Sequence, residues 1–117
     1  MDDRLLQQLK KGVLEMLVLE MICQAPTYGY ELMSQLKTRS QDLFTLKEGT
    51  LYPILYRLED DGMILSSWSQ GQGKAAPKKK YTATEKGLPA PKTRQQVWHS
   101  FYRTVNAFYT QEDTENG

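Results

Sequence analysis

The apolar residues of this chain change from helical spacing to strand spacing at Gly62, and this change constrains the fold more than any other feature. Before the glycine, apolar residues three and four positions apart predict the buried face of a helix that runs to Asp61. The residues of this face are Leu51, Ile54, Leu55 and Leu58. After the glycine, residues 63–68 and 80–83 are strand candidates, and the link between them contains two glycines and a proline. The two segments therefore predict a β-hairpin.

Two helical segments precede this pattern. Apolar residues over residues 5–23 wrap most of a helical circumference, which predicts a central and mostly buried helix. Pro26 ends this helix, because the residue before a proline is pushed away from helical backbone angles. Thr27 is then expected to cap a short amphipathic helix over residues 28–38. The apolar stripe of that helix comprises Tyr28, Leu32, Met33 and Leu36.

The helix that ends before Gly62 has more than one candidate start and contains a proline. Residues 45–48 match a capping box with Thr45 as the first capping residue, although a start one or two residues later serves equally well. Pro53 lies inside the helix and crowds the carbonyl four residues earlier, which belongs to Gly49. Because Gly49 has no side chain to add to the strain, we expect a bend at Pro53 rather than a break.

The last part of the chain predicts a long, aromatic-rich helix that ends at about residue 110. Residues 84–87 resemble a helix start, but Pro89 and Pro91 follow within two turns, so a kink or restart is expected near Pro91. The apolar residues beyond it are Val97, Trp98, Phe101, Tyr102, Val105, Phe108 and Tyr109. This band is broad for a terminal helix in a chain of 117 residues, which indicates a surface covered by a second subunit.

Charge is nearly balanced overall and segregated along the chain. The sequence has 15 Lys and Arg against 14 Asp and Glu, which gives a net charge of +1. This balance argues against indiscriminate binding of polyanions by the whole surface. The cations gather between residues 74 and 94, whereas acidic residues gather in the tail after residue 111. A nucleic-acid site would therefore have to be local.

The sequence lacks the patterns of a metal, cofactor or catalytic site. Cys23 is the single cysteine and His99 the single histidine, so no zinc-ligand spacing occurs and no metal is expected. Neither a nucleophile elbow nor a phosphate-binding glycine loop is present, and no cofactor or enzymatic activity is expected. Cys23 is expected to fill the core and His99 to lie at the surface. With no signal-peptide pattern and no apolar run of about 20 residues, we expect a cytoplasmic protein that does not cross a membrane.

The order helix, helix, helix, hairpin, helix predicts an α+β, mostly α fold: a winged helix-turn-helix with an additional C-terminal helix. Residues 28–32 read Tyr-Gly-Tyr-Glu-Leu, and residues 48–64 run from Glu-Gly-Thr-Leu-Tyr-Pro to Asp-Gly-Met-Ile. Together with Lys79-Lys80-Tyr81 and residues 82–87, these segments resemble the PadR family of bacterial transcriptional regulators. The resemblance covers most of residues 9–87.

The resemblance implies a sequence-specific DNA-binding regulator. The helix before Gly62 would enter the major groove, and the hairpin, or wing, would reach the backbone. The implied DNA-contacting residues of the helix are Lys47, Thr50, Tyr52 and Tyr56, and those of the wing are Lys78, Lys79 and Lys80. The family's wing is richer in arginine, so here we expect point-charge attraction to phosphates rather than bidentate recognition.

The resemblance also implies a homodimer that binds a pseudo-palindromic operator, with half-site centres roughly 34–36 Å apart. Residues 1–87 would form the DNA-binding domain, and residues 88–117 the dimerisation helix and acidic tail. The sequence around Trp98, Phe101 and Tyr102 is similar to that of the smaller, multidrug-responsive branch, which implies a site for a planar aromatic effector at the dimer centre. Repression, relieved by that effector, is the implied control. Pro89 and Pro91 depart from the family pattern, so the dimer geometry is not implied.

Each of these assignments has a simpler structural alternative. Lys78, Lys79 and Lys80 could form a solvated hairpin tip, and Tyr52 and Tyr56 could pack within the protein. The three aromatic residues at 98, 101 and 102 could serve as dimer contacts without binding a ligand. A winged helix can also act as a protein–protein interaction module that does not bind DNA, because a fold does not fix a function.

Overall fold

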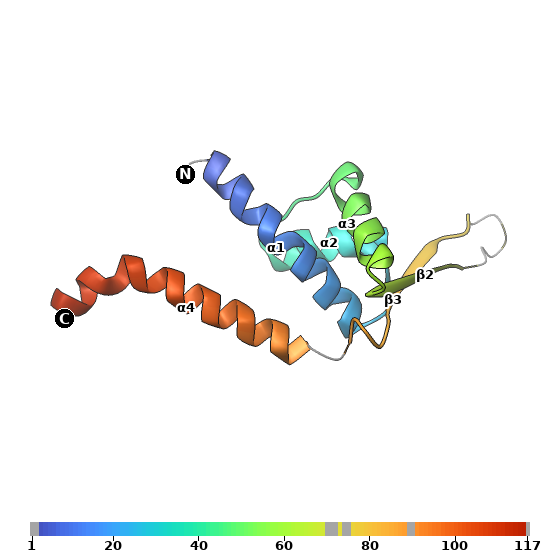
Figure 1. Ribbon diagram of the computed structural model, residues 1–117. Coiled ribbons are helices and arrows are strands. Elements are labelled where there is room, and N and C mark those ends of the chain that lie inside the picture. The colour runs from blue at the N-terminus through green and yellow to red at the C-terminus, as the bar shows by residue number, and fades with distance from the viewer. Residues whose placement is uncertain (1–2, 70–72, 74–75, 89–90, 117) are drawn as a thin grey trace.

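In the residues that the computed structural model describes (3–69, 73, 76–88 and 91–116), four helices accompany a three-stranded antiparallel sheet (Figure 1). The helices are α1 (Asp3–Gln24), α2 (Gly29–Arg39), α3 (Glu48–Asp60) and α4 (Pro91–Asn116). The strands are β1 (Thr27–Tyr28), β2 (Ile64–Trp68) and β3 (Lys79–Ala83), in the sheet order β1-β3-β2. The predicted fold, a mostly helical winged helix-turn-helix with a C-terminal helix, is confirmed.

One hydrophobic core lies where α1, α2, α3 and the sheet meet. The predicted apolar face of α3 lies in this core, and Leu51 and Leu55 are completely buried. Leu32 and Leu36 fill it from α2, as predicted, and Ile64 and Tyr81 fill it from the sheet. The opposite face of α3 stays exposed, so the core fixes which side of this helix meets solvent.

The prediction of a mostly buried first helix is wrong for the N-terminal half of α1. Leu14, Val18, Leu19 and Ile22 are buried in the core, but Leu5 and Leu9 are 54% and 59% exposed. Because α1 has 22 residues, it extends beyond the small body formed by α2, α3 and the sheet. The apolar residues of its first turns therefore remain largely exposed to solvent.

Thr27 and Tyr28 form a short strand that the sequence analysis missed. Thr27 pairs with Tyr81 and Tyr28 pairs with Lys80 in β3, so α2 begins one residue later than expected. Thr27 does not cap the helix: its hydroxyl donates to Glu31 Oε2 at 3.2 Å, and Tyr28 takes the capping position without a side-chain hydrogen bond. Strand pairing thus orders the residues that precede α2.

The structure has the later of the expected starts for α3. Lys47 is the first capping residue, and the predicted capping box at Thr45 does not form because the Thr45 hydroxyl donates to the Asp42 carbonyl at 3.0 Å. The preceding turn contains Gln41 and Asp42 at positive φ. The helix continues through Pro53 without a break.

The two predicted wing strands pair antiparallel. Their register runs from Ile64 opposite Ala83 to Trp68 opposite Lys79. Beyond the ladder, the backbone N–H of Ser69 donates to the Lys78 carbonyl at 2.7 Å, and the Ser69 hydroxyl accepts from the Lys78 N–H at 3.1 Å. These bonds extend the pairing of the wing past the ends of β2 and β3.

Residues 84–87, which resemble a helix start in the sequence, form a turn and not a helix. The Thr84 hydroxyl donates to the Gly62 carbonyl at 2.5 Å and accepts from the Gly87 N–H at 3.1 Å, which ties this turn to the end of α3. The expected restart at Pro91 is confirmed. Helix α4 runs to Asn116, past the expected end near residue 110, because neither glycine nor proline occurs between Pro91 and Gly117.

Helix α4 projects from the body and makes the molecule elongated (Figure 1). The principal extents are 66 × 32 × 21 Å. In Figure 1, α4 diverges from the N-terminal part of α1, and the wing extends on the other side of the body. The two candidate sites, on α3 with the wing and on α4, therefore lie in different parts of the chain.

Candidate nucleic-acid interface

The outward face of α3 carries three of the residues singled out in the sequence. Lys47 and Thr50 are exposed at the N-terminal end of the helix, and Tyr56 is 55% exposed two turns later. Arg57 is also exposed and forms an ion pair with Glu15 of α1, with an Nε–Oε1 distance of 3.5 Å. This face presents hydrogen-bonding and cationic groups that no core contact requires.

Tyr52 lies differently from its neighbours on α3. Its side chain is half-buried at the edge of the core, and its hydroxyl oxygen lies against Gly29 at the start of α2. A Cβ atom on Gly29 would be 3.0 Å from that oxygen, which explains the glycine in the Tyr-Gly-Tyr-Glu-Leu segment. Tyr52 therefore joins α3 to α2, and its hydroxyl is directed into the protein.

The three wing lysines divide between the two faces of β3, because alternate side chains of a strand point to opposite faces. Lys79 shares a face with the buried Tyr81, and its Nζ lies 5.7 Å from the centre of the Tyr56 ring. Lys78 is exposed on the other face, with its Nζ 6.0 Å from the Tyr28 ring centre. Lys80 is half-buried and lies opposite Tyr28.

A pocket of about 600 Å³ lies between the start of α2, α3 and the wing. Aromatic side chains from these elements line it, together with Lys78 and Lys79. The sequence analysis did not assign four of its aromatic residues to the site: Tyr28, Tyr30, Trp68 and Tyr81. Alternation along β3 could have indicated Tyr81, because it places this residue on the same face as Lys79. The pocket joins the wing and the outward face of α3 in one surface.

The hydroxyl of Tyr81 is buried beneath this pocket. No residue that the structure describes accepts or donates a hydrogen bond there. Burial raises the pKa of Tyr81 to about 12, and the charges of Tyr52, Glu59 and Tyr56 contribute to the increase. The phenol is therefore neutral over the physiological pH range.

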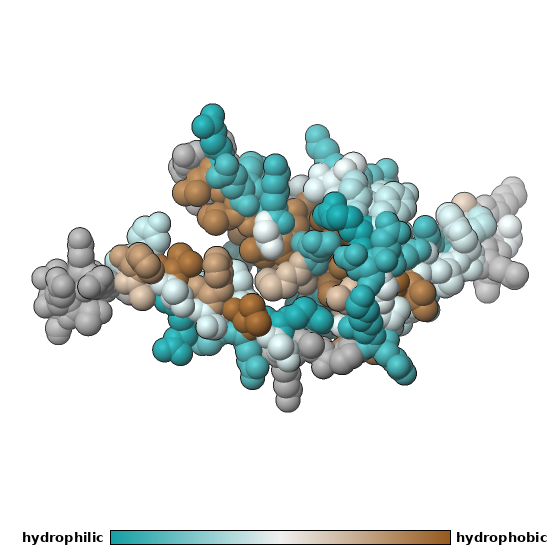
Figure 2. Space-filling model, in the orientation of Figure 1, coloured by the Kyte–Doolittle hydropathy of each residue, from teal (hydrophilic) through white to brown (hydrophobic). Residues whose placement is uncertain are grey.

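Helix α4 exposes the aromatic residues that were assigned to an effector site or a dimer interface. Trp98, Phe101 and Tyr102 are 39%, 62% and 51% exposed. The Trp98 ring centre lies 6.4 Å from that of Phe101 and 6.2 Å from that of Tyr102, in tilted arrangements. Figure 2 shows hydrophobic residues gathered along α4 and on the neighbouring part of α1.

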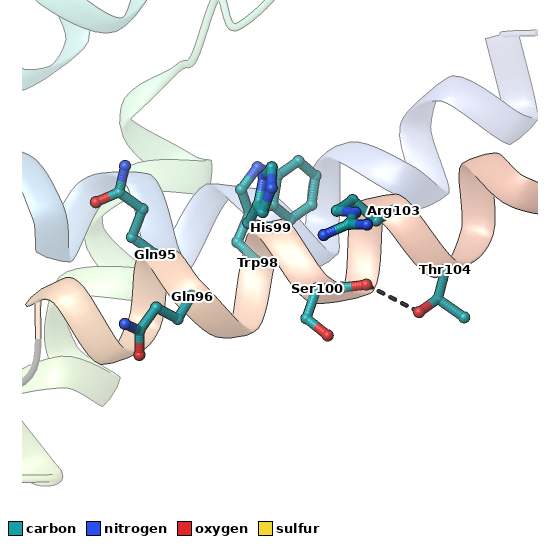
Figure 3. Close-up of a pocket in the computed structure, with 7 residues that line it drawn as sticks. All are labelled: Gln95, Gln96, Trp98, His99, Ser100, Arg103 and Thr104. Atoms are coloured by element: carbon teal, nitrogen blue, oxygen red, sulfur yellow. Dashed lines mark hydrogen bonds between the residues drawn. The ribbon is translucent and has the colours of Figure 1, made fainter.

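Trp98 lines three pockets: one of about 550 Å³ lies between α1, Phe44 and the start of α4, and the other two extend along α4. An apolar groove of about 690 Å³ runs between α1 and α4 and is lined by all three aromatic residues. A second, more polar pocket of about 830 Å³ lies along α4, and its seven lining residues all come from that helix (Figure 3). Within it, the Thr104 hydroxyl donates to the Ser100 carbonyl at 2.9 Å. Because a single helix lines the second pocket, the α1–α4 groove is the better defined of the two.

Arg94 connects α4 to the base of the wing, a contact that no sequence pattern indicated. Its Nη2 donates to the Gly87 carbonyl at 2.9 Å and lies 3.9 Å from Glu20 Oε2. The same nitrogen lies 3.5 Å from Cys23 Sγ, and the thiol donates to the Gly87 carbonyl at 3.4 Å. Burial raises the pKa of Cys23, and the thiol packs against the core, as expected, in addition to donating this hydrogen bond.

The part of the chain that the structure describes offers neither a metal site nor a membrane span. Within residues 3–69, 73, 76–88 and 91–116, no three acidic, cysteine or histidine side chains converge as a metal site would require. His99 is exposed, as expected. Across the same described ranges, no helix has the length and apolar character needed to span a bilayer.

Comparison with known proteins gives matches over most of the chain. Solved structures that it resembles include a transcriptional regulator from Clostridium thermocellum, with 25% identity, coverage of 86% of this chain and 97% of that one, and a TM-score of 0.77. A PadR family regulator from Eggerthella lenta has 31% identity, coverage of 91% and 89%, and a TM-score of 0.77. A PadR-like regulator from Bacillus cereus has 32% identity, coverage of 87% and 96%, and a TM-score of 0.72.

The sequence comparisons agree with the structural ones. An uncharacterized curated protein from Lysinibacillus sphaericus is 35% identical over 54 residues, which are 46% of this chain. The matched part spans half the length of that relative. A family model, the transcriptional regulator PadR-like family, matches residues 18–91, a range that contains α2, α3 and the wing. The chain therefore belongs to the PadR-like family of transcriptional regulators.

Proposed function

We propose that this regulator binds DNA sequence-specifically, with α3 in the major groove and the wing against the sugar–phosphate backbone. The observation that carries the proposal is the position of the wing beside the outward face of α3, where Lys79 Nζ lies 5.7 Å from the exposed Tyr56 ring. A helix fits the major groove and an adjoining hairpin can reach the neighbouring backbone. Such a regulator acts in the cytoplasm, where the bacterial chromosome lies, and has no catalytic role.

The exposed residues of α3 and the wing divide into two roles. Thr50 and Tyr56 supply hydroxyl groups and a ring that can contact base edges, so they contribute sequence preference. Lys47, Lys78 and Lys80 neutralise phosphates and contribute salt-sensitive affinity. Tyr52, whose hydroxyl is directed at Gly29, packs α3 against the start of α2.

The functional unit is a homodimer. Helix α4 exposes an apolar face that includes Val97, Phe101 and Phe108, and Leu9 of α1 lines the same groove as Val97 and Phe101. An exposed apolar face of this kind is rare on a monomer, and a second copy of the chain would cover it. The twofold axis would then place two α3 helices in successive major grooves of a pseudo-palindromic operator.

The α1–α4 groove would hold a planar aromatic effector. Trp98 lies in this groove between Phe101 and Tyr102, and the rings could stack on a flat ligand where the dimer excludes water. Binding there would release the DNA by changing the spacing of the two α3 helices, so the regulator would act as a repressor. In a Trp68→Phe protein, Trp98 is the single tryptophan, and its emission should change on titration with planar cationic dyes. Unchanged emission with every dye would rule against this site.

Footprinting on the DNA upstream of the protein's own gene tests the DNA-binding proposal. The wild-type protein should protect two half-sites with centres about 10 base pairs apart, or a multiple of this spacing. Thr50→Ala should weaken that footprint and alter the protected sequence, whereas Lys78→Ala should weaken it without changing the sequence. No protection of any segment, even at the highest protein concentration that stays soluble, would contradict the proposal.

A further inference from the structure

Lys79 lies on one face of the wing sheet, and Lys78 and Lys80 lie on the other. Lys79 lies directly opposite Trp68 in β2 and shares its face of the sheet with Tyr81. That face is directed towards α3, where Tyr56 is the nearest aromatic ring to the lysine. Lys79 is half-buried, whereas Lys78 is exposed.

Three aromatic rings from three different elements surround the Lys79 ammonium group. Its Nζ lies 5.7 Å from the ring centre of Tyr56 in α3, and 5.9 Å from the ring centres of Trp68 in β2 and Tyr81 in β3. Each distance is within the range of about 6 Å at which a cation is attracted to the face of an aromatic ring. Tyr81 is buried and fixes the base of this arrangement, while Tyr56 and Trp68 are 55% and 69% exposed.

We propose that Lys79 is a positioning residue, which holds the wing against α3 through these three rings and does not contact a DNA phosphate. Three rings leave the Lys79 ammonium group fewer directions from which a phosphate could approach than the single ring of Tyr28 leaves the Lys78 group. Because Tyr56 belongs to α3 and Trp68 to the outer end of β2, the lysine between them links the outer part of the wing to α3. Held in this way, the wing reaches the DNA already oriented, and little ordering is needed on binding.

The expected effect of Lys79 on DNA affinity rests on the proposed function, whereas its contact with the three rings does not. Lys78 and Lys80 project from the other face of β3 and remain the phosphate ligands of the wing. The proposal therefore predicts different consequences for neighbouring lysines of the same charge. Salt dependence distinguishes the two roles, because each neutralised phosphate contributes a slope of about −0.9 to the plot of log K against log salt concentration.

The first experiment measures DNA affinity over a salt series for Lys79→Met, Lys79→Arg and Lys78→Met proteins. Lys79→Met should weaken binding roughly threefold to tenfold at every salt concentration and leave the slope unchanged. Lys79→Arg should restore the affinity, because a guanidinium group also lies favourably over aromatic rings. Lys78→Met should make the slope shallower by about 0.9 per wing. An equally shallow slope for Lys79→Met would overturn the proposal.

The second experiment detects the contact by NMR in the absence of DNA. Ring currents should shift the Lys79 Hε protons upfield of those of Lys78, and Tyr56→Leu with Trp68→Leu should remove most of the shift. The shift should persist when operator DNA is added. An unshifted Lys79 signal in the free protein, or loss of the shift in the complex, would contradict the positioning role. If the wild-type protein binds no DNA, the proposed function fails while the NMR result still decides whether the contact exists.

Discussion

The hydroxyl oxygen of Tyr52 lies so close to Gly29 that a methyl group on that glycine would be 3.0 Å from it. Tyr52 belongs to α3 and Gly29 opens α2, so this contact sets how closely the two helices of the helix-turn-helix approach. A separation of 3.0 Å is tighter than ordinary van der Waals contact between carbon and oxygen, and one partner would have to move. A side chain at position 29 therefore fits only if it or the Tyr52 hydroxyl moves by a few tenths of an ångström.

Gly29→Ala should lower the free energy of unfolding by roughly 1–3 kcal/mol, because the added methyl group crowds the Tyr52 hydroxyl. Urea unfolding followed by circular dichroism measures this change. In the Tyr52→Phe background the hydroxyl is absent, and the same Gly29→Ala substitution should cost much less. Equal costs in the two backgrounds would show that the phenolic oxygen does not set the approach of the helices.

Gly87→Ala should destabilise the protein strongly, because its Cβ would overlap the carbonyl oxygen of Met63. That carbonyl already accepts a hydrogen bond from the Thr84 N–H at 3.0 Å, so it cannot move without breaking the turn between β3 and α4. The expected loss is roughly 1–3 kcal/mol or more, measured by thermal unfolding.

Gly49→Ala provides a matched control, since a Cβ at Gly49 meets no described side chain within 4 Å. Alanine in the first turn of α3 should leave stability unchanged or raise it by about 0.5–1 kcal/mol. The account of the Gly87 turn is wrong if the two substitutions have equal effects.

Tyr81→Phe should stabilise the protein at pH 7, because it removes a buried hydroxyl that no described residue satisfies. Leaving such a group unpaired costs roughly 1–3 kcal/mol, and part of this cost should be recovered. The phenyl ring of the variant would still face Lys79. Lower stability of Tyr81→Phe than of the wild type at pH 7 would mean that the hydroxyl has a partner.

The same variant should respond differently to alkaline pH. The pKa of Tyr81 in the folded chain is about 12, above its ordinary value of 10.0. The neutral phenol is therefore favoured by folding, and its contribution is fully present below pH 10 and is lost as the pH rises towards 12. The stability of the wild type should fall more steeply than that of Tyr81→Phe over this interval, as measured by urea unfolding at each pH. Parallel curves would contradict the raised pKa.

Phe101→Asp should convert the dimer into monomers, because it places a charge on the apolar face of α4 proposed to be covered by a second copy. Light scattering after size-exclusion chromatography measures the molecular mass. Ser100→Asp adds the same charge to the more polar side of α4, which lines the pocket of Figure 3, and should leave the mass of the dimer unchanged. A wild-type mass of 13.5 kDa, that of one chain, would refute the dimer outright.

Sequence patterns predicted the elements whose cause is local. The helical spacing of Leu51, Leu55 and Leu58 determined the buried face of α3, and the glycine at 62 marked its end. Pro91 marked the start of α4 because its ring suits the first turn of a helix. Burial of one face then determined that Lys47, Thr50 and Tyr56 are exposed.

Features that depend on distant residues were not predictable from these patterns. The strand at Thr27 exists because β3 offers an unpaired edge, and the position of Arg94 depends on the Gly87 carbonyl at the base of the wing. Tyr52 was grouped with the outward residues because its spacing on α3 does not indicate that its hydroxyl packs against Gly29 of α2. The exposure of Leu5 and Leu9 was also not predictable, because it depends on how far α1 extends beyond the rest of the folded body.

The most direct test of the account is a fluorescence-anisotropy titration of a labelled duplex from the protein's own upstream region, in parallel with a shuffled duplex of the same composition. The account predicts binding to the upstream duplex on the order of 10³-fold tighter, or more, than to the shuffled one at physiological salt, as for specific regulators in general. It also predicts that Thr50→Ala reduces this ratio. Equal affinities for the two duplexes, or no binding to either, would contradict the assignment of α3 and the wing as a sequence-specific DNA interface.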